Sequence, residues 1–318
     1  MTKSISAAAI CGAIALGLVA ASPAAATGAN RTWVSAQQGL DGNPCTLAAP
    51  CRTFAYALTQ TAAGGEIVAL TPGGYGQATI TQAISIVNEG GNGEVVIAGS
   101  AGNNGITINA GPNDIVNLRG LTLEGLGVGT NGIAFNSGGS LAIANVVARR
   151  FTSSGINIQP NSASNFSLSN VTGSDNGNCG IAVDPSGSGR FVGVVSKALI
   201  TNNQNSGICV DGHANGATGS VLVTIVDSVV SSNTNSGIAG SSSGGTAAVN
   251  VTIKNSVISN NPSNGLYLGT NAAMRIAHSV VTGNGTGIGA SGIQSFGDND
   301  IAGNTNDALG NLTTISTH

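Results

Sequence analysis

The 318-residue chain has little charge and few aromatic side chains. Only 7% of its residues are charged, against about 25% in an average domain, and it holds one Trp, three Tyr and six Phe. Nucleic acid is bound by clustered Lys and Arg, but the ten basic residues here are scattered and the formal net charge is −3, so we expect no nucleic-acid partner. With 41% hydrophobic residues, the chain is also unlike a disordered protein.

The first 26 residues are typical of a secretory signal peptide. Lys3 precedes an apolar stretch over residues 5–21, and the small residues Ala24, Ala25 and Ala26 follow it. The apolar stretch is short for a membrane span, and no later segment is long and apolar enough, so we expect no span after signal removal. The sequence therefore predicts a secreted, periplasmic or cell-surface protein.

A glycine followed by Ile or Leu recurs along the chain, and the segment before it alternates apolar and polar residues. Such alternation is typical of β-strands, and the irregular spacing of roughly 22 to 30 residues indicates the coils of a solenoid with loops of variable length. The glycines are Gly105, Gly132, Gly155, Gly180, Gly207, Gly237, Gly265 and Gly287.

Polar residues occupy three fixed positions relative to the glycine, and this predicts three corners in each coil. The sequence therefore indicates an all-β fold, a parallel β-helix with three sheets, in which asparagines at the corners bond to the asparagine stacked on them. Ten residues before the glycine stand Asn145, Asn170, Lys197, Asp227 and Asn255; four after it stand Asn109, Asn136, Gln159, Asp184, Asp211 and Ser241. The asparagine ladder is predicted at Asn203, Asn233, Asn261 and Asn284.

The segment Thr53–Ala63 has helical spacing and directly precedes the first predicted strand, Glu66–Leu70. An amphipathic helix there would cover the apolar end of the solenoid. We therefore expect an N-terminal extension and capping helix over residues 27–65, and the β-helix with a C-terminal edge segment over 66–318.

Three segments carry a resemblance to a known family: CRTFAYAL and AAGGEIVALTPGGY near the start, and FGDNDIAGNTND near the end. The chain resembles the secreted right-handed parallel β-helix proteins of the pectate-lyase-like superfamily, although Glu66 stands where that opening more often has Asp. The resemblance implies right-handed coils, export and frequent polysaccharide contact. It fixes no chemistry, because this fold hosts catalytic and non-catalytic members.

The best catalytic candidates are Asp184 and Asp211, with His213 close by in sequence. Both aspartates fall in one corner column on neighbouring coils, at about the 5 Å separation that a pair of glycosidase carboxylates can have. The alternative is structural, since Asn, Gln and Ser fill the rest of that column. Glu124 has no partner that the sequence identifies, and no residue spacing predicts a metal site.

We therefore expect a non-catalytic structural or glycan-contacting module, with Tyr267 as the candidate binding residue, in contact with a polysaccharide or cell-envelope glycan. The alternatives are a polysaccharide lyase or glycoside hydrolase using Asp184 and Asp211, and an adhesin-like passenger. No cofactor is expected, except that calcium would be needed by a lyase of this superfamily.

Four cysteines remain after signal removal. Cys45 and Cys51 flank a short loop and predict a local disulfide. Cys179 lies one residue before its glycine and Cys209 lies two after. On extended strands this offset would separate their Cα atoms by about 11 Å, so we expect two free thiols.

Overall fold

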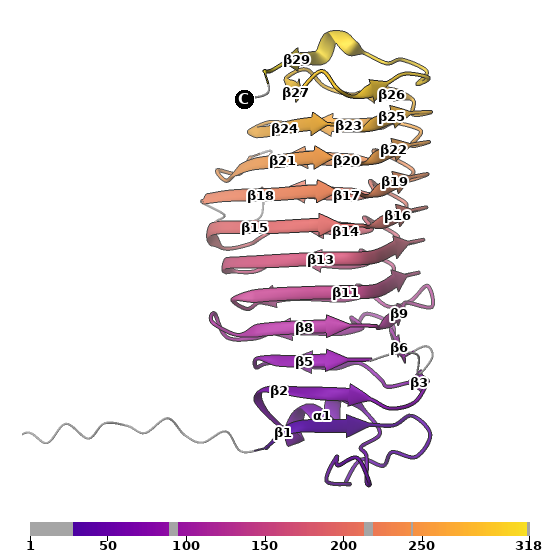
Figure 1. The fold of residues 1–318 in the computed structure, drawn as a ribbon, viewed down its shortest axis with the longest axis vertical. Helices are drawn as coiled ribbons and strands as arrows, with labels where there is room; N and C mark the ends of the chain where they lie inside the picture. The colour runs from indigo at the N-terminus through magenta and orange to yellow at the C-terminus, as the bar shows by residue number, and fades with distance from the viewer. Residues whose placement is uncertain (1–27, 89–94, 213–218, 243, 317–318) are drawn as a thin grey trace, which may run out of the picture.

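The protein is a right-handed parallel β-helix whose coils stack into a long column (Figure 1). This computed structural model describes residues 28–88, 95–212, 219–242 and 244–316. The predicted signal peptide, residues 1–26, lies outside the described residues. Every pairing between named strands is parallel, as the repeat predicts.

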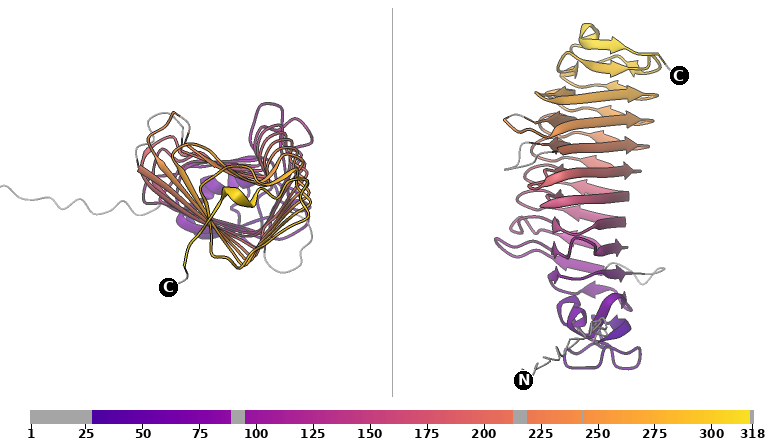
Figure 2. Two further views of the ribbon diagram at one scale, coloured as in Figure 1. Left: turned by 90° about the horizontal axis from the view of Figure 1, so that it is seen from above. Right: turned by 90° about the vertical axis from the view of Figure 1, so that its left-hand side faces the viewer.

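Three columns of strands form the three faces of the coil, which is seen end-on in the left view of Figure 2. The first face contains β1 (Ala29–Val34), β2 (Thr61–Ala69), β5 (Ile84–Val87), β8 (Ile115–Arg119), β11 (Ser140–Arg149), β13 (Ser162–Ser174), β15 (Ser188–Ser196), β18 (Gly219–Val226), β21 (Ala248–Lys254), β24 (Ala272–Ala277), β27 (Ile293–Ser295) and β29 (Leu312–Thr314). The second contains β3 (Gly73–Gly74), β6 (Val95–Ala98), β9 (Thr122–Glu124), the ends of β11 and β13, β16 (Leu199–Thr201), β19 (Val229–Ser231), β22 (Val257–Ser259), β25 (Val280–Thr282) and β28 (Asp300–Ile301). The third contains β4 (Ala78–Ile80), β7 (Ile106–Asn109), β10 (Ile133–Ser137), β12 (Ile156–Ile158), β14 (Ile181–Val183), β17 (Ile208–Asp211), β20 (Ile238–Ser241), β23 (Asn264–Leu268) and β26 (Thr286–Ile288).

The first and second faces form one continuous 20-stranded sheet, whereas the third is a separate sheet of nine strands. The two faces join because β11 and β13 run without a break through the corner between them. The predicted three-sheet coil is therefore present in shape, with two of its sheets connected.

The helix α1 (Phe54–Gln60) occupies the N-terminal end, inside the predicted segment. The Thr53 hydroxyl accepts a hydrogen bond from the Tyr56 N–H and caps the helix, which buries Phe54 and Ala57. Within the described residues it is the only α-helix, beside the single 3-10 turn η1 (Leu309–Asn311). β1 precedes α1 in the sequence and already pairs with β2, so the stack of strands begins before the helix (Figure 1). The capping role of α1 therefore stays a prediction.

The core is a stack of aliphatic side chains that point inward from every strand. In the third sheet, Ile181 lies beside Ile208 and Ile208 beside Ile238, and all three are fully buried. Burial of such columns from three directions gives the solenoid one continuous core, since each coil covers the apolar surface of the next.

The corner between the first two faces holds its residues in the left-handed backbone region. This position is the polar column ten residues before the glycine, where Asn, Asp and Gly are favoured because they tolerate a positive φ. The members are Asn145 (φ 55°), Asn170 (52°), Lys197 (52°), Asp227 (52°) and Asn255 (49°). His278 (47°) holds the same corner in the next coil, nine residues before Gly287. The Asn170 amide also donates to Asn145 Oδ1 at 2.8 Å, so this corner carries part of a hydrogen-bonded ladder.

A second, buried ladder runs through the corner before the third sheet. Side-chain Nδ2 groups donate to the Oδ1 of the next coil: from Asn203 to Asn233 at 2.9 Å, from Asn233 to Asn261 at 3.1 Å, and from Asn261 to Asn284 at 2.9 Å. These are the four predicted ladder residues. Asn176 and Asn304 extend the ladder at its two ends, and its last amide donates to Asp307. The side chains of these buried asparagines thereby find partners away from water.

The ladder explains the recurring glycine. A Cβ added at Gly180 would lie 2.9 Å from Asn203 Nδ2, and one added at Gly207 would lie 2.7 Å from Asn233 Nδ2. The same clash recurs at Gly237 and Gly265. An aliphatic side chain of the following coil lies still closer to the added Cβ: Ile200 at Gly180, at 2.5 Å, and Val230 at Gly207. Glycine is therefore required at this position by close approach, because any side chain would displace both the core residue and the buried asparagine of the following coil.

Candidate functional site

A hollow with a volume of about 540 Å³ lies on the outer surface of the third sheet, across β14, β17, β20 and β23. Outward-facing residues of neighbouring strands form its floor: Ala182, Cys209, Ala239 and Tyr267 follow one another in register. The first three are small, whereas Tyr267 is 42% exposed and stands at the last strand of the row. The result is a low floor that ends at an aromatic ring.

Carboxylates line one side of this hollow. Asp184 directly follows Val183, which pairs with Val210, and Asp211 directly follows Val210, so the two aspartates occupy one column on neighbouring coils. Both are half-buried and both line the hollow. The structure therefore brings the two predicted aspartates to one site. His213 lies outside the described residues.

The aspartate column continues a ladder of amides from earlier coils. Asn136 Nδ2 donates to Asn109 Oδ1 at 2.9 Å, and Gln159 Nε2 donates to Asn136 Oδ1 at 2.7 Å. The Asp184 backbone N–H bonds to the Ile158 carbonyl oxygen at 2.8 Å, as expected of the next coil. The corner geometry is thus shared, and the side chains change from amides to carboxylates where the column reaches the hollow.

Asparagine amides line the opposite side. Asn205 Nδ2 donates to Asn178 Oδ1 at 2.9 Å, and Asn235 Nδ2 donates to Asn205 Oδ1 at 3.1 Å. All three residues line the hollow. A ladder of this kind leaves amide groups at a regular spacing of about 4.8 Å along the column axis. This ladder is more exposed than the one that begins at Asn203, and the sequence analysis did not predict it.

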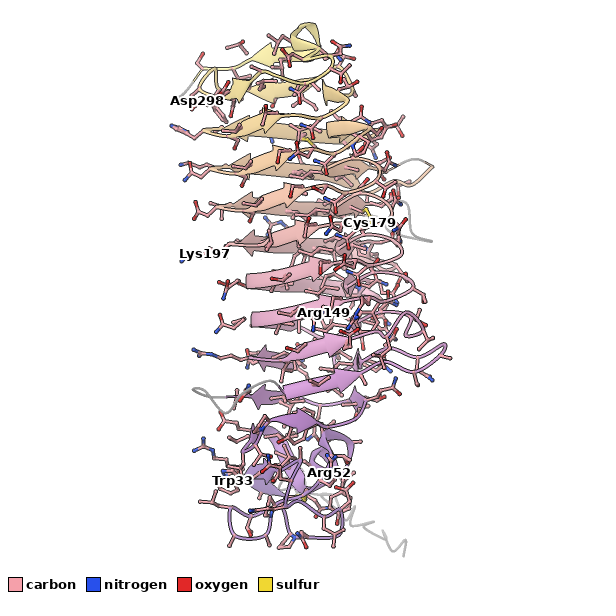
Figure 3. All side chains as sticks on the ribbon, turned by 90° about the vertical axis from the view of Figure 1, so that its right-hand side faces the viewer. Trp33, Arg52, Arg149, Cys179, Lys197 and Asp298 are labelled. Carbon is pink, nitrogen blue, oxygen red and sulfur yellow. A yellow bond between two sulfur atoms is a disulfide. The ribbon has the colours of Figure 1, made fainter. Side chains whose placement is uncertain are left out.

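A disulfide between Cys179 and Cys209 forms part of the floor, with the two Cα atoms 6.2 Å apart. The predicted free thiols are therefore wrong, although the register used to predict them is right, since Ile181 pairs with Ile208. The error lies in treating the chain before Gly180 as extended. Cys179 lies in the bend ahead of β14, where the chain is not extended. The offset of three residues relative to the glycine therefore spans less than the roughly 10 Å of three strand residues. Cys179 lies on the side of the column away from Lys197 in Figure 3.

The second disulfide, between Cys45 and Cys51, is the one that the sequence predicts. Its Cα atoms lie 4.7 Å apart, and both cysteines are buried. It closes the polar loop between β1 and α1, far along the chain from the hollow.

An ion cluster around the buried carboxylate of Glu124 was not found from the sequence. Arg149 Nε donates to Glu124 Oε2 at 2.9 Å, and Arg150 contacts both carboxylate oxygens, at 2.8 and 2.6 Å. Burial alone would raise the pKa of the Glu124 carboxyl, but the hydrogen bonds from Arg150, the Leu126 backbone N–H and Arg149 outweigh it and hold the pKa below its usual range. Glu124 raises the pKa of Arg150 through the same contact. Arg149 pairs with Glu124 across coils, because β9 and β11 are neighbours.

The described residues contain no group of three or more His, Cys, Asp or Glu that is arranged to hold a metal ion. Among the described residues that line the hollow, the only charged side chains are Asp184 and Asp211. In the same part of the chain, none of the helices has the length and apolar character of a membrane span.

No protein-family model and no curated protein sequence matches the chain. Several solved structures are similar to it in fold, among them pectate lyase Pel9A and XylC. Pectate lyase Pel9A superposes with a TM-score of 0.60 at 17% identity, over 85% of this chain and 72% of the lyase. XylC, in its complex with xylose, superposes with a TM-score of 0.56 at 10% identity, over 83% of this chain and 68% of XylC. The chain therefore has a parallel β-helix fold, as the sequence resemblance implied.

Proposed function

We propose that this protein is an exported, non-catalytic module that binds a polysaccharide or cell-envelope glycan in the hollow over the third sheet. The observation that carries the proposal is that three kinds of sugar-binding group line one hollow. They are the exposed ring of Tyr267, the carboxylates of Asp184 and Asp211, and the amides of Asn178, Asn205 and Asn235.

These groups match the chemistry of a sugar. A tyrosine ring offers an apolar face with a polar edge, carboxylates accept hydrogen bonds from hydroxyl groups, and amides both donate and accept. The volume of about 540 Å³ is in the usual range of ligand sites, about 300–1,000 Å³. The carboxylate and amide sides both repeat once per coil, so the hollow favours an extended ligand that lies along the column axis.

The fold neighbours support a glycan as the ligand class. One is named as a pectate lyase and another was solved with xylose. The two disulfides support export, because such bonds persist in oxidising compartments. Together with the predicted signal peptide over residues 1–26, they support a secreted, periplasmic or cell-surface location. Binding of this kind requires no cofactor.

Catalysis at Asp184 and Asp211 is the second candidate function, as a glycoside hydrolase or polysaccharide lyase. Their position in one column on adjacent coils favours it, because neighbouring parallel strands lie about 4.8 Å apart and retaining glycosidases hold their two carboxyl groups about 5 Å apart. For the hydrolase, one aspartate would act as the acid and the other as the nucleophile.

A glycan array followed by titration of the best oligosaccharide tests the binding function. The Y267A variant should weaken binding about fivefold to tenfold, the loss expected for one aromatic contact. L199A is the matched control, since Leu199 is 46% exposed on the second face of the column. Equal affinity in wild type and Y267A would place the ligand elsewhere. Release of reducing ends or of unsaturated products by the wild type, lost in D184N, would favour the enzyme instead.

A further inference from the structure

We infer that the Cys179–Cys209 disulfide is a modification site for low-molecular-weight thiols. A thiol that enters the hollow exchanges with this disulfide and becomes bonded to Cys209. Such exchange needs no glycan, so it is independent of the proposed function. Three features of the molecule support it: the place of this disulfide, the unequal exposure of its two cysteines, and the burial of the second disulfide.

The disulfide lies in the floor of the hollow, and both of its cysteines line that hollow. Cys209 stands on β17 between Ile208 and Val210, whose side chains are buried in the core, so the Cys209 side chain points outward. The strands on either side carry Ala182 and Ala239 at the same register. These two side chains are single methyl groups, so the floor leaves room for a small molecule beside the Cys209 sulfur.

The two cysteines differ in exposure. Cys209 is half-buried, whereas Cys179 is only 2% exposed, in the bend ahead of β14. Thiol–disulfide exchange begins when a thiolate attacks one of the two sulfurs, and access decides which one is attacked. The attack therefore falls on Cys209, and Cys179 is the leaving group. Because Cys179 belongs to the preceding coil, the thiolate approaches in line with the S–S bond from the side of the following coil, where Ala239 stands.

The exchange proceeds in two steps. The sulfur of the incoming thiolate forms a bond to the Cys209 sulfur as the Cys179–Cys209 bond breaks, and the Cys179 thiolate takes up the proton that the incoming thiol released. The product is a mixed disulfide at Cys209 and a free thiol at Cys179. A second thiol molecule then attacks the sulfur of the bound thiol, which reduces Cys209 and releases the thiol as its own disulfide. In the mixed state, the adduct fills the floor of the hollow between Ala182 and Ala239.

The Cys45–Cys51 disulfide provides an internal reference. Its two cysteines are 1% and 0% exposed, and both belong to the hydrophobic core. A thiol reaches these sulfurs only after the surrounding structure has opened, which slows the exchange. Exposed disulfides are the labile or regulatory ones, in contrast to buried structural ones. The chain therefore carries one disulfide of each kind.

The test treats the folded protein with 2-mercaptoethanol, a small uncharged thiol, in the absence of denaturant. Samples are trapped with N-ethylmaleimide at intervals and digested, and mass spectrometry identifies the state of each cysteine. We expect Cys179–Cys209 to react about tenfold faster than Cys45–Cys51, or more. The first product should carry mercaptoethanol on Cys209 and the maleimide on Cys179.

The A239L variant tests the route of approach. It should slow the exchange at Cys179–Cys209 about fivefold, because the longer side chain covers the Cys209 sulfur on the side of the attack. T79L is the matched control: Thr79 is exposed at the same outward position of the third sheet, on β4 and outside the hollow, so this change should leave the rate as it is. Thermal midpoints of both variants show whether the fold has been loosened.

Three outcomes would overturn the inference. Equal rates for the two disulfides would show that exchange requires opening of the whole fold. Mercaptoethanol found first on Cys179 would show that the exposure of Cys209 does not direct the attack. An unchanged rate in a stably folded A239L would show that the hollow is not the route of approach. None of these measurements involves a glycan, so a failed glycan array would remove the proposed function and leave this inference standing.

Discussion

Asn233 Oδ1 accepts two hydrogen bonds from Asn203, one from its backbone N–H at 3.1 Å and one from its side-chain Nδ2 at 2.9 Å. Asn233 in turn gives its own backbone and side-chain N–H groups to Asn261. Each buried asparagine therefore satisfies the coil before it and depends on the coil after it, so the ladder links neighbouring coils through polar as well as apolar contacts.

Replacing Asn233 by Ala should lower the free energy of unfolding by about 2 kcal/mol, because the buried backbone N–H of Asn203 loses its acceptor. The Asn203 side-chain Nδ2 loses one acceptor as well but keeps the Gly173 and Thr201 carbonyl oxygens. Chemical denaturation monitored by circular dichroism measures the loss. T234A is the control: the neighbouring Thr234 is exposed, and its truncation should change the free energy by less than about 0.5 kcal/mol. A similar small effect in N233A would mean that water replaces the ladder.

Removing the Cys179–Cys209 disulfide should destabilise the protein more than removing Cys45–Cys51. The first closes a loop of 30 residues and the second a loop of six, so the unfolded-chain model gives about 3.6 and about 2.2 kcal/mol. The paired variants C179A/C209A and C45A/C51A are compared by their denaturation midpoints. Mass spectrometry of the alkylated, unreduced protein must also show both bonds, and free thiols at Cys179 or Cys209 would contradict the structure.

Changing Glu124 to Gln should cost about 2 kcal/mol at neutral pH, because Arg149 and Arg150 lose their shared carboxylate. The pKa of Glu124 is lowered in the folded protein, so the stability that the carboxylate adds is fully present above its unfolded value, about 4.3, and is lost as the pH falls through the folded value. The gap between wild type and E124Q should therefore shrink in acid.

E66Q is the matched control for that comparison. Glu66 pairs with Arg31 at 2.9 Å, but both side chains are substantially exposed, so its loss should cost less than about 1 kcal/mol. A pH-independent difference between wild type and E124Q would show that packing, and not the ion cluster, stabilises this corner.

The left-handed corner predicts opposite effects for two substitutions at one residue. Lys197 has a φ of 52°, so K197N should leave the protein equally or more stable, whereas K197V should destabilise it by about 1–2 kcal/mol. The thermal midpoint measures both. K254V is the control, because Lys254 is exposed on the regular strand β21 and a β-branched residue is favoured there. Equal midpoints for K197N and K197V would contradict the assigned backbone.

The solenoid and its register could be predicted because they follow from periodicity. Alternation and the recurring glycine mark the strands, and the glycine column aligns Ile181 with Ile208, as the structure has it. The Cys179–Cys209 bond could not be predicted in the same way, because a bend changes the path between two residues without changing their spacing in sequence. Glu124 was missed for a related reason: its partners lie 25 and 26 residues away, and the pairing depends on β9 and β11 being neighbours.

The candidate site was predicted in part. Asp184 and Asp211 were predicted because they share one corner column on neighbouring coils, and Tyr267 because it lies at an outward strand position. All three line one hollow. The ladder of Asn178, Asn205 and Asn235 was missed, although each of the three stands two residues before a recurring glycine. Polar residues are common in the loop before the glycine, so this position does not stand out from the polar residues around it.

Each coil pairs only with its two neighbours, so the number of coils in this molecule can change without altering the pairing of the rest. Asn203, Asn233 and Asn261 are interchangeable members of one ladder, and the glycines Gly207, Gly237 and Gly265 repeat in step with them. Deletion of one repeat between equivalent residues would set Asn203 against Asn261 and restore the same hydrogen bonds. A lineage of such proteins can therefore gain or lose whole coils by recombination, and the number of coils under the hollow can change without rebuilding the core.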